Sequence, residues 1–325
     1  MKKIGGRILL GILLAFVVLI VYTIWDNNRI TITEQKVMIE DLPEQLKGFR
    51  ILHVTDLHEK EFGNNQAKLI DAINAINYDA IVFTGDMLDS TQSTDFTSFY
   101  TLLEGITNKE NAWFVPGNTD PYSYQFNPDI EKSEFIKGME KRGVKLLESI
   151  DTAEIDGSEV HFVNFELAIV KDSEHVGISN GVVTPPYESN EKYIAHRKQL
   201  WEGMEKIEDE KTVIALNHYP VVDARIDYIK NSSSKVLRDF DLIMAGHYHG
   251  GQIRLPFVGA LFVPEPWYNN SFFPPKDRVN GLWEYKQMKQ YVSTGLGSSD
   301  SILFLKFRLF NPPEINLITL ERQAK

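Results

Sequence analysis

The sequence predicts an α/β domain that contains parallel β-strands, with one apolar helix placed before it. Three observations support this prediction. From residue 49 onward, short apolar runs rich in β-branched and aromatic residues alternate with amphipathic helical patterns. Several of these runs end in glycine or polar residues, as strands do where they leave a sheet. Residues 8–25 form an uncharged apolar stretch that precedes the alternating region.

The N-terminal apolar stretch predicts a transmembrane anchor. Residues 8–25 are 18 positions without a charge, close to the roughly 20 that a helix needs to cross a ~30 Å hydrocarbon core. No small-x-small cleavage site follows, although a cleaved signal peptide stays as the alternative. Lys2, Lys3 and Arg7 precede the stretch, so the positive-inside rule keeps that end cytoplasmic. We expect a single-pass protein of the cell membrane, anchored by residues 1–30 and extracytoplasmic beyond them.

The composition disfavours nucleic-acid binding and excludes any role that needs a cysteine. The net charge is −11, and without Lys2, Lys3 and Arg7 the chain has 31 basic against 45 acidic residues, or about −14. This balance disfavours binding to nucleic acid through a broad basic footprint. The chain has no cysteine, which excludes disulfides, zinc-finger sites and a thiol nucleophile.

The first part of the globular region predicts βαβ units. A polar juxtamembrane lead-in at 31–48 contains a candidate edge strand. The runs FRILHVTD at 49–56 and YDAIVFTGD at 78–86 predict strands separated by a helical pattern. A segment near 94–108 leads to the run AWFVPGNTD, and a helical pattern at 133–143 leads to VKLLES. This order of elements is typical of parallel strands joined by helices.

The second part predicts a mixed sheet. Beyond residue 150, AEI and VHFVNFE flank a turn-like DGSE and indicate a hairpin. A loop at 171–191 and a helix to about residue 207 precede two more strands, at 212–220 and 241–251. The last third, with GLWEYK, QYVSTGLG, LFLKFRLF and EINLITL, is rich in β patterns. Because no long flexible linker divides the chain, we expect residues 49–325 to form one domain.

Five predicted strands end in residues that can bind a metal ion. The motifs are DLH at 56–58, GD at 85–86, GN at 117–118, NH at 217–218 and GHYH at 246–249. The carboxyl edge of an open α/β sheet is where ligands bind. Within DLH and HYH the two candidate ligands are one residue apart, so alternate strand positions would direct both to one side.

Each motif alone is weak evidence, but the motifs together favour a metal site over turns and core residues. Four of the eight histidines lie at these strand ends. Carboxylate and imidazole ligands without thiolate suit Mn, Fe, Zn or Ni. We interpret His53 as a core histidine. Five other polar residues are interpreted as solvated or structural: Asp79, Asp89, His161, His175 and His196.

In this order, DLH, GD, GNTD, NHYP and GHYHGGQ resemble the motifs of the calcineurin-like metallophosphoesterase superfamily, over roughly residues 50–252. The anchor and the closing FRLFNPPEINLITL at 307–320 resemble a bacterial membrane-anchored branch of it. The resemblance implies a four-layer α/β/β/α sandwich of two mixed sheets, with a dinuclear metal site at the carboxyl ends of the strands. It also implies a hydrolase that cleaves a phosphate ester by attack of a hydroxide bridging two divalent ions.

The resemblance further implies a role for individual residues. One ion is assigned to Asp56, His58 and His249, the second to Asn118, His218 and His247, and Asp86 bridges both. The implied catalytic residues are Asp86, Asn118, Asp120 and His218.

One position departs from the family pattern. The third motif is commonly Gly-Asn-His followed by Asp or Glu, and its histidine helps to protonate the leaving oxygen, whereas this chain has Thr119 there. A threonine is a poor proton donor, and general acid catalysis contributes roughly 10²- to 10⁴-fold. Three explanations stay open. The leaving group needs little help, as in a pyrophosphate; Asp120 or a residue of 171–191 supplies the proton; or activity has been lost.

These features predict hydrolysis of a phosphomonoester or, given Thr119, of a phosphodiester or pyrophosphate in a lipid or cell-envelope intermediate. The stretch at 262–283 is interpreted in two ways: as a lip whose Trp267, Tyr268, Phe272 and Phe273 receive an acyl or prenyl chain, or as a Pro-broken loop that completes the core. The alternative from another functional class is a catalytically silent, metal-stabilised, membrane-tethered binding module.

Overall fold

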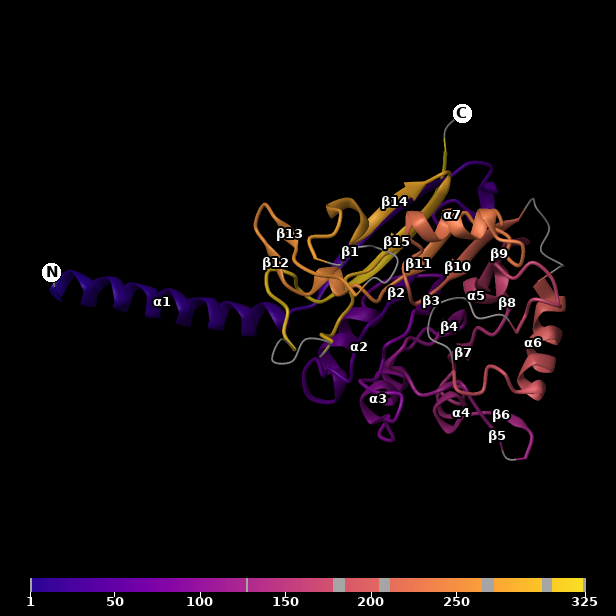
Figure 1. Ribbon diagram of the computed structural model, residues 1–325, viewed down its shortest axis with the longest axis horizontal. Helices are drawn as coiled ribbons and strands as arrows, with labels where there is room; N and C mark the ends of the chain where they lie inside the picture. The colour runs from indigo at the N-terminus through magenta and orange to yellow at the C-terminus, as the bar shows by residue number, and fades with distance from the viewer. Residues whose placement is uncertain are drawn as a thin grey trace.

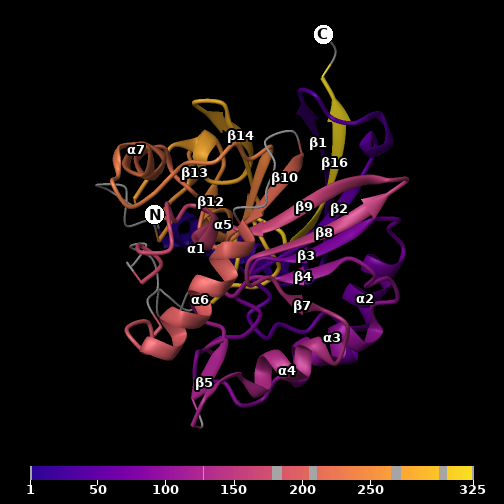
Figure 2. The same cartoon turned by 90° about the vertical axis from the view of Figure 1, so that its right-hand side faces the viewer.

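Two six-stranded mixed sheets pack face to face in the computed structural model, and helices cover their outer faces (Figures 1 and 2). The structure describes residues 2–126, 128–177, 185–204, 211–264, 272–299 and 306–323. The first sheet has the order β1 (Thr31–Ile39), β16 (Glu314–Arg322), β2 (Arg50–Val54), β3 (Ala80–Phe83), β4 (Ala112–Phe114) and β7 (Lys145–Leu146). The second has the order β14 (Gly281–Tyr285), β15 (Met288–Val292), β11 (Leu242–Ala245), β10 (Thr212–Leu216), β9 (Ser158–Asn164) and β8 (Ile150–Ile155).

Three helices pack on each sheet, which completes the predicted four-layer sandwich. The first sheet is covered by α2 (Ala67–Asn74), α3 (Thr97–Gly105) and α4 (Glu134–Glu140). The second is covered by α5 (Phe165–Ala168), α6 (Glu191–Met204) and α7 (Asp223–Asn231). The short strands are β5 (Tyr124–Phe126), β6 (Ile130–Lys132), β12 (Arg254–Leu255) and β13 (Gly259–Ala260), and 3₁₀ turns lie at Glu44–Leu46, Asn64–Gln66, His249–Gly251 and Lys276–Arg278.

The central strand β3 is apolar along its whole length because both of its faces are covered. In β3, Ala80 and Val82 face the second sheet, while Ile81 and Phe83 face the helices. Parallel pairing joins β2, β3, β4 and β7 in one sheet and β9, β10, β11 and β15 in the other. Their carboxyl ends therefore meet at one edge of the sandwich.

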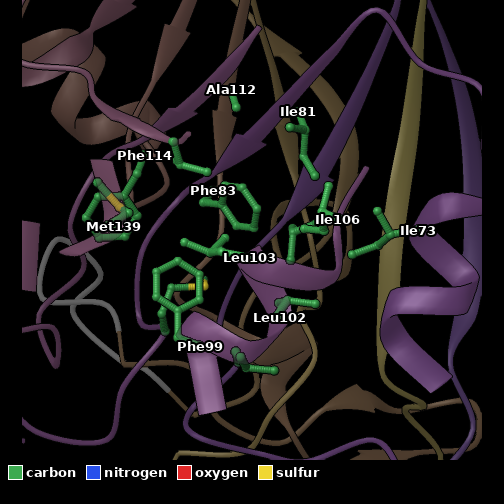
Figure 3. Packing of buried hydrophobic residues seen from close by; sticks show 14 of the residues in the cluster. Ile73, Ile81, Phe83, Phe99, Leu102, Leu103, Ile106, Ala112, Phe114 and Met139 are labelled. Atoms are coloured by element: carbon green, nitrogen blue, oxygen red, sulfur yellow. The ribbon is translucent and has the colours of Figure 1, made fainter. Parts of the chain in front are cut away.

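The outer core shows why the helical patterns were readable. Figure 3 shows the side chains of α3 directed toward those of β3 and β4. Phe99, Leu102 and Leu103 have the i, i+3, i+4 spacing of one helix face, and all three are buried. Phe99 packs against Phe83 and Phe114, with ring centroids 5.7 and 6.2 Å apart.

The predicted edge strand in the lead-in is confirmed, whereas a later segment differs from expectation. β1 lies at the edge of the first sheet, where it pairs in parallel with β16 along its full length and buries Val37 and Ile39. The sequence predicts β structure at 303–310, but 306–310 is irregular and forms only an isolated bridge between Leu309 and Ile253. The reason is that its backbone binds the end of α1 and the 252–254 segment instead. Residues 303–305 lie outside the described residues.

The first helix, α1 (Lys2–Asn27), projects from the domain (Figure 1). Its segment Gly5–Asn27 is the one helix in the described ranges that is long and apolar enough to cross a membrane. The end of α1 is fixed to the domain: the Asn27 side chain donates to the Arg308 carbonyl (2.6 Å) and accepts from the Arg308 N–H (2.8 Å). Tyr22 also packs on Phe310, with ring centroids 5.3 Å apart.

Trp113 offers a test of the contact between the sheets. Its ring stacks on Phe162 of the second sheet (4.3 Å between centroids), and its N–H donates to Asp151 (3.0 Å). We expect Trp113→Ala to lower the free energy of unfolding by about 3–5 kcal/mol, because it leaves a cavity between the sheets. Chemical denaturation of the full chain in detergent micelles measures this loss. Trp113→Phe is the control that keeps a ring but removes the donor, and equal losses for both variants would contradict the stacking argument.

Candidate metal centre

Polar side chains from both sheets converge where the strands end. Asp56 and His58 follow β2, Asp86 follows β3 and Asn118 follows β4; His218 follows β10, and His247 and His249 follow β11. The six carboxylates and imidazoles among them are almost completely buried. The structure therefore brings all seven predicted ligands to one edge of the sandwich.

The first group of potential ligands contains Asp56, His58, Asp86 and His249. His58 Nε2 lies 3.2 Å from His249 Nε2 and 3.5 Å from Asp86 Oδ2. His249 Nε2 lies 3.6 Å from Asp56 Oδ1. Two imidazoles and two carboxylates thus direct their donor atoms at one point.

The second group contains Asp86, His218 and His247, with Asn118 beside them. His218 Nε2 lies 3.3 Å from Asp86 Oδ2, 3.1 Å from His247 Nδ1 and 3.2 Å from Asn118 Oδ1. Asp86 belongs to both groups. Its carboxylate is therefore where the two candidate ion positions meet.

These separations fit a shared ion. Ligand atoms about 2.1 Å from a metal lie about 3.0 Å apart at right angles and about 3.4 Å apart at the tetrahedral angle. Four of the six separations, 3.1 to 3.3 Å, lie in this range, and the other two, 3.5 and 3.6 Å, correspond to somewhat wider angles at the metal. In both groups, ring nitrogens of two histidines face each other inside the protein. Ligands of one shared cation have this arrangement. The nitrogen and oxygen donors suit divalent transition ions.

Three of the four imidazoles have the nitrogen on their far side bound to a fixed partner. His58 Nδ1 pairs with Asp89 Oδ1 (3.2 Å), His218 Nδ1 with the Thr84 carbonyl (2.8 Å), and His247 Nε2 with the Pro264 carbonyl (3.1 Å). Such partners orient the rings, so that the other nitrogen faces the metal. The sequence interpretation of Asp89 as merely solvated or structural missed this contact, and its position three residues after Asp86 was the available signal.

The argument from alternate strand positions is wrong, although the residues do converge. β2 ends at Val54 and β11 ends at Ala245, so both strands end before their pair of candidate ligands begins. Five of the seven residues instead have left-handed backbone, with φ between 48° and 68°: Asp56, His58, Asp86, His247 and His249. Non-glycine residues rarely adopt this conformation, and Asp and His tolerate it better than most. The sharp turns it produces aim the side chains back over the strand ends.

Glycine lets two of these turns touch. A side chain at Gly85 would collide with the backbone of Gly117, and one at Gly117 would collide with Asp86. Because both positions lack a Cβ, the Asp86 turn can lie directly against the Asn118 turn. The glycine of GNTD therefore permits a close approach between two ligand-bearing turns.

Asp120 holds these turns in place from behind. Its two carboxylate oxygens accept N–H groups from Asp86 (2.7 Å), Met87 (2.9 Å), Leu88 (3.2 Å) and Gly117 (2.8 Å). Burial and the nearby Asp86 charge raise its pKa to about 6. The catalytic role predicted for Asp120 stays a prediction, and these contacts favour a positioning role.

Thr119 is also committed to the loop. Its N–H donates to Asp86 Oδ1 (2.8 Å), and its hydroxyl donates to the Leu88 carbonyl (2.6 Å). The hydroxyl proton is therefore used inside the protein. The position that carries histidine in the common family pattern here orients the shared carboxylate.

The electrostatics favour ionised Asp86 and neutral His247. Burial would raise the pKa of Asp86, but His218 and His58 outweigh it and lower that pKa. Burial and His218 lower the pKa of His247 to about 3, and burial lowers that of His249 well below its usual value. Burial alone would lower the pKa of His218, but Asp86 raises it to about 9. Because metal binding requires ionised carboxylate and neutral imidazole, an ion in the second group must displace the proton that the raised pKa of His218 favours.

The chain belongs to the calcineurin-like phosphoesterase family, whose model matches residues 49–251. It is 25% identical to an uncharacterized metallophosphoesterase of Campylobacter jejuni, over 95% of this chain and 69% of that one. It is 25% identical to one of Bacillus subtilis, over 91% and 87% of the two chains. It is 23% identical to the UDP-2,3-diacylglucosamine pyrophosphatase LpxG of Chlamydia muridarum, over 90% and 91%.

Similar solved structures include the phosphopantetheinyl hydrolase of Mycobacterium tuberculosis. The sequence identity is 14% and the TM-score 0.41, over 77% of this chain and 91% of that one. The family and the buried His/Asp cluster together make the protein a metal-dependent phosphoric ester hydrolase.

Asp89 provides a test of the outer contacts. We expect Asp89→Asn to weaken metal binding about 10- to 100-fold, because the His58 ring loses its charged partner. Titration of the metal-free full chain with Mn²⁺ or Zn²⁺ against a competing chelator measures the affinity. Asp95→Asn is the matched control, since Asp95 is exposed in the same region and accepts the Thr97 N–H (2.9 Å). Equal affinities for both variants would contradict the proposed contact.

Proposed function

We propose that this calcineurin-like phosphoesterase is a membrane-anchored enzyme that hydrolyses a lipid-linked phosphodiester or pyrophosphate with two bound divalent ions. The proposed ligands are Asp56, His58 and His249 for one ion and Asn118, His218 and His247 for the other, with Asp86 shared. The observation that carries the proposal is the place of Asp86 Oδ2, 3.5 Å from His58 in one group and 3.3 Å from His218 in the other.

Divalent ions in these positions would supply Lewis acidity and lower the pKa of a water molecule that attacks phosphorus. The chain's own residues would position that chemistry. The Thr119 N–H holds Asp86 Oδ1, so that Oδ2 faces both groups. Asn118 would contribute a neutral oxygen next to His218. We assign Asp120 the role of a positioning residue, because its oxygens accept four backbone N–H groups.

Thr119 supports a substrate whose leaving group needs little protonation. Because its hydroxyl donates to the Leu88 carbonyl, it is not available to a leaving oxygen in this arrangement. A phosphate leaving group is stabilised as an anion, whereas an alkoxide requires a proton. A pyrophosphate or an activated diester is therefore favoured over an alkyl monoester. The pyrophosphatase name of the Chlamydia relative agrees with this class of substrate.

Two different cavities border the centre, which supports a substrate with one polar and one apolar part. A cavity whose lining mixes polar and apolar groups touches Asn118 and His218 and is also lined by Tyr122, Tyr187 and Arg197. A mainly apolar cavity touches His249 and is also lined by Ile253, Leu261, Phe262 and Phe272. We propose that the first receives the polar head of the substrate and the second an acyl or prenyl chain. Trp267 and Tyr268, which the sequence suggests for the same role, lie outside the described residues.

The proposed location follows from α1. An uncharged apolar helix with basic residues at its N-terminal side favours a cytoplasmic N-terminus and an extracytoplasmic domain. The substrate would then be reached from the outer side of the membrane. Nucleic acid is not a proposed partner, given the acidic net charge.

Removal of the shared carboxylate tests the enzyme and the site together. We expect the full chain, reconstituted with Mn²⁺ or Zn²⁺, to hydrolyse bis-p-nitrophenyl phosphate and a UDP-linked lipid. Asp86→Ala should lower the rate by more than about 10²-fold, since even a partner outside the ligand shell can contribute 10–100-fold. Elemental analysis of the same samples should show loss of bound metal.

Asp71→Ala is the control, because Asp71 is exposed on α2. Full activity of Asp86→Ala would refute the site. Normal metal content of the unaltered protein without hydrolysis of any tested ester would favour the silent binding module instead.

Thr119→His tests the leaving-group argument. We expect an alkyl phosphate to be cleaved faster by about 10²-fold, the lower end of a general-acid contribution, with little change for p-nitrophenyl esters. Thr119→Val removes the hydrogen bond to Leu88 without adding a proton donor and controls for disturbance of the loop. Steady-state rates on both ester types decide the outcome. Equal gains on the two esters would refute the argument.

A further inference from the structure

An exposed apolar surface lies beside the point where α1 leaves the domain. We call it the hairpin face. It comprises Leu255, Phe257 and Val258 of the β12–β13 hairpin, together with Phe272, Phe273 and Phe310. Phe257 at the hairpin tip is 99% exposed, Phe273 is 67% exposed and Phe272 is 60% exposed. Several exposed apolar side chains gathered on neighbouring segments mark an interaction site more often than a chance exposure.

The backbone of the hairpin face gives a second reason to assign it a function. Three of its phenylalanines have left-handed backbone: Phe257 at φ 66°, Phe273 at φ 52° and Phe310 at φ 51°. This conformation is unfavourable for bulky residues. The side chain of Phe257 obtains no compensating burial within the domain. A binding partner outside the domain would supply that burial.

Hydrogen bonds connect the hairpin face to α1. Arg308 and Asn27 are joined by two bonds, and the next residue, Leu309, bonds through its backbone to Gln252 (3.1 Å) and Arg254 (3.0 Å). On the other side, the Phe273 N–H donates to the Leu261 carbonyl (2.8 Å). Figures 1 and 2 agree that β12 and β13 lie next to the domain end of α1. The face is therefore held in a fixed place relative to the helix.

The level of the face along α1 matches a membrane interface. Phe310 packs on Tyr22, which lies near the domain end of the apolar stretch and close to Trp25 (6.0 Å between centroids). Tyrosine and tryptophan at such positions typically lie at the headgroup level. The hairpin tip also has a cation beside it, since the exposed Lys276 donates through Nζ to the Phe257 carbonyl (2.5 Å). An ammonium group there suits anionic headgroups.

We propose that the hairpin face inserts into the interfacial layer of the bilayer that holds α1 and fixes the orientation of the domain on the membrane. The inference rests on the anchoring proposed above. It adds a second membrane contact and names its residues. A lipid bilayer is the favoured occupant because the face is continuous with α1, the one segment of the described chain suited to span it.

This contact has a consequence for the substrate. Leu261, Phe262 and Phe272 line the apolar cavity at His249, and they come from the same segments as the hairpin face. A phosphate attached to a membrane-held chain would then reach the metal centre without the chain leaving an apolar environment. The orientation of the domain thus selects lipid-linked esters over soluble ones.

Site-directed spin labelling tests the contact in the full chain. The protein has no cysteine, so each introduced cysteine carries the only label. Phe257→Cys reports on the hairpin tip and Leu14→Cys on the middle of α1. Asp156→Cys is the matched control, because Asp156 is an exposed residue at the turn between β8 and β9, strands on the side of the domain away from α1 (Figure 1).

The labelled proteins are reconstituted into vesicles of phosphatidylcholine and phosphatidylglycerol, and power saturation compares accessibility to oxygen and to a water-soluble nickel chelate. We expect oxygen to dominate at positions 14 and 257 and the nickel chelate to dominate at 156. If oxygen dominates at position 14 but the nickel chelate dominates at position 257, the hairpin contact alone would be overturned. The nickel chelate at both 14 and 257 would overturn the anchor as well. Dipolar broadening between labels at 257 without lipid contact would assign the face to a second copy of the chain.

Discussion

The rest of the site depends on the contacts that stabilise the buried carboxylate of Asp86. A lone carboxylate inside a protein is costly, so its burial requires compensating partners. Asp86 has them from both sides: imidazoles of His58 and His218 at one oxygen and the Thr119 N–H at the other. Because β3 carries Asp86 at the middle of the first sheet, the second sheet must lie close enough for His218 to reach it. The packing of the two sheets is thus also a condition of the chemistry.

The elements defined by a local sequence pattern were the most predictable part of the fold. β3 could be read from AIVF because both of its faces are covered, and α3 from the spacing of Phe99, Leu102 and Leu103. The long-range partners were less predictable. Nothing local to ITITEQKVMI shows that β1 pairs with β16, a strand more than 270 residues later in the chain. The apolar residues of the 306–310 segment resemble a strand pattern. They are apolar because the segment packs on α1 and the hairpin, and it does not join a sheet.

The candidate site shows the same division between types of residue and their arrangement. The ligand types could be recognised from the motifs, but the left-handed turns that aim them could not be derived from strand periodicity. Asp89 and Asp120 carry the same carboxylate group and differ in what it contacts. Asp89 pairs with a histidine ring and the Lys306 ammonium, whereas Asp120 accepts four backbone N–H groups. Such contacts depend on the approach of separate loops, which Gly85 and Gly117 permit. Residue identity alone therefore cannot distinguish a carboxylate that orients a ligand histidine from one that holds a loop through its backbone.

The junction between α1 and the domain links the candidate membrane helix to the candidate metal centre. Asn27 and Arg308 are joined by two hydrogen bonds, and the buried Arg308 guanidinium donates to the Gly297 and Asn311 carbonyls. The Asn311 side chain in turn donates to the His249 carbonyl (2.6 Å). One short chain of contacts thus runs from the end of α1 to a residue of the candidate centre. A flexible linker would let the domain move freely relative to α1, whereas this junction holds it in one orientation. The geometry of the candidate centre relative to α1 is then a property of the fold itself.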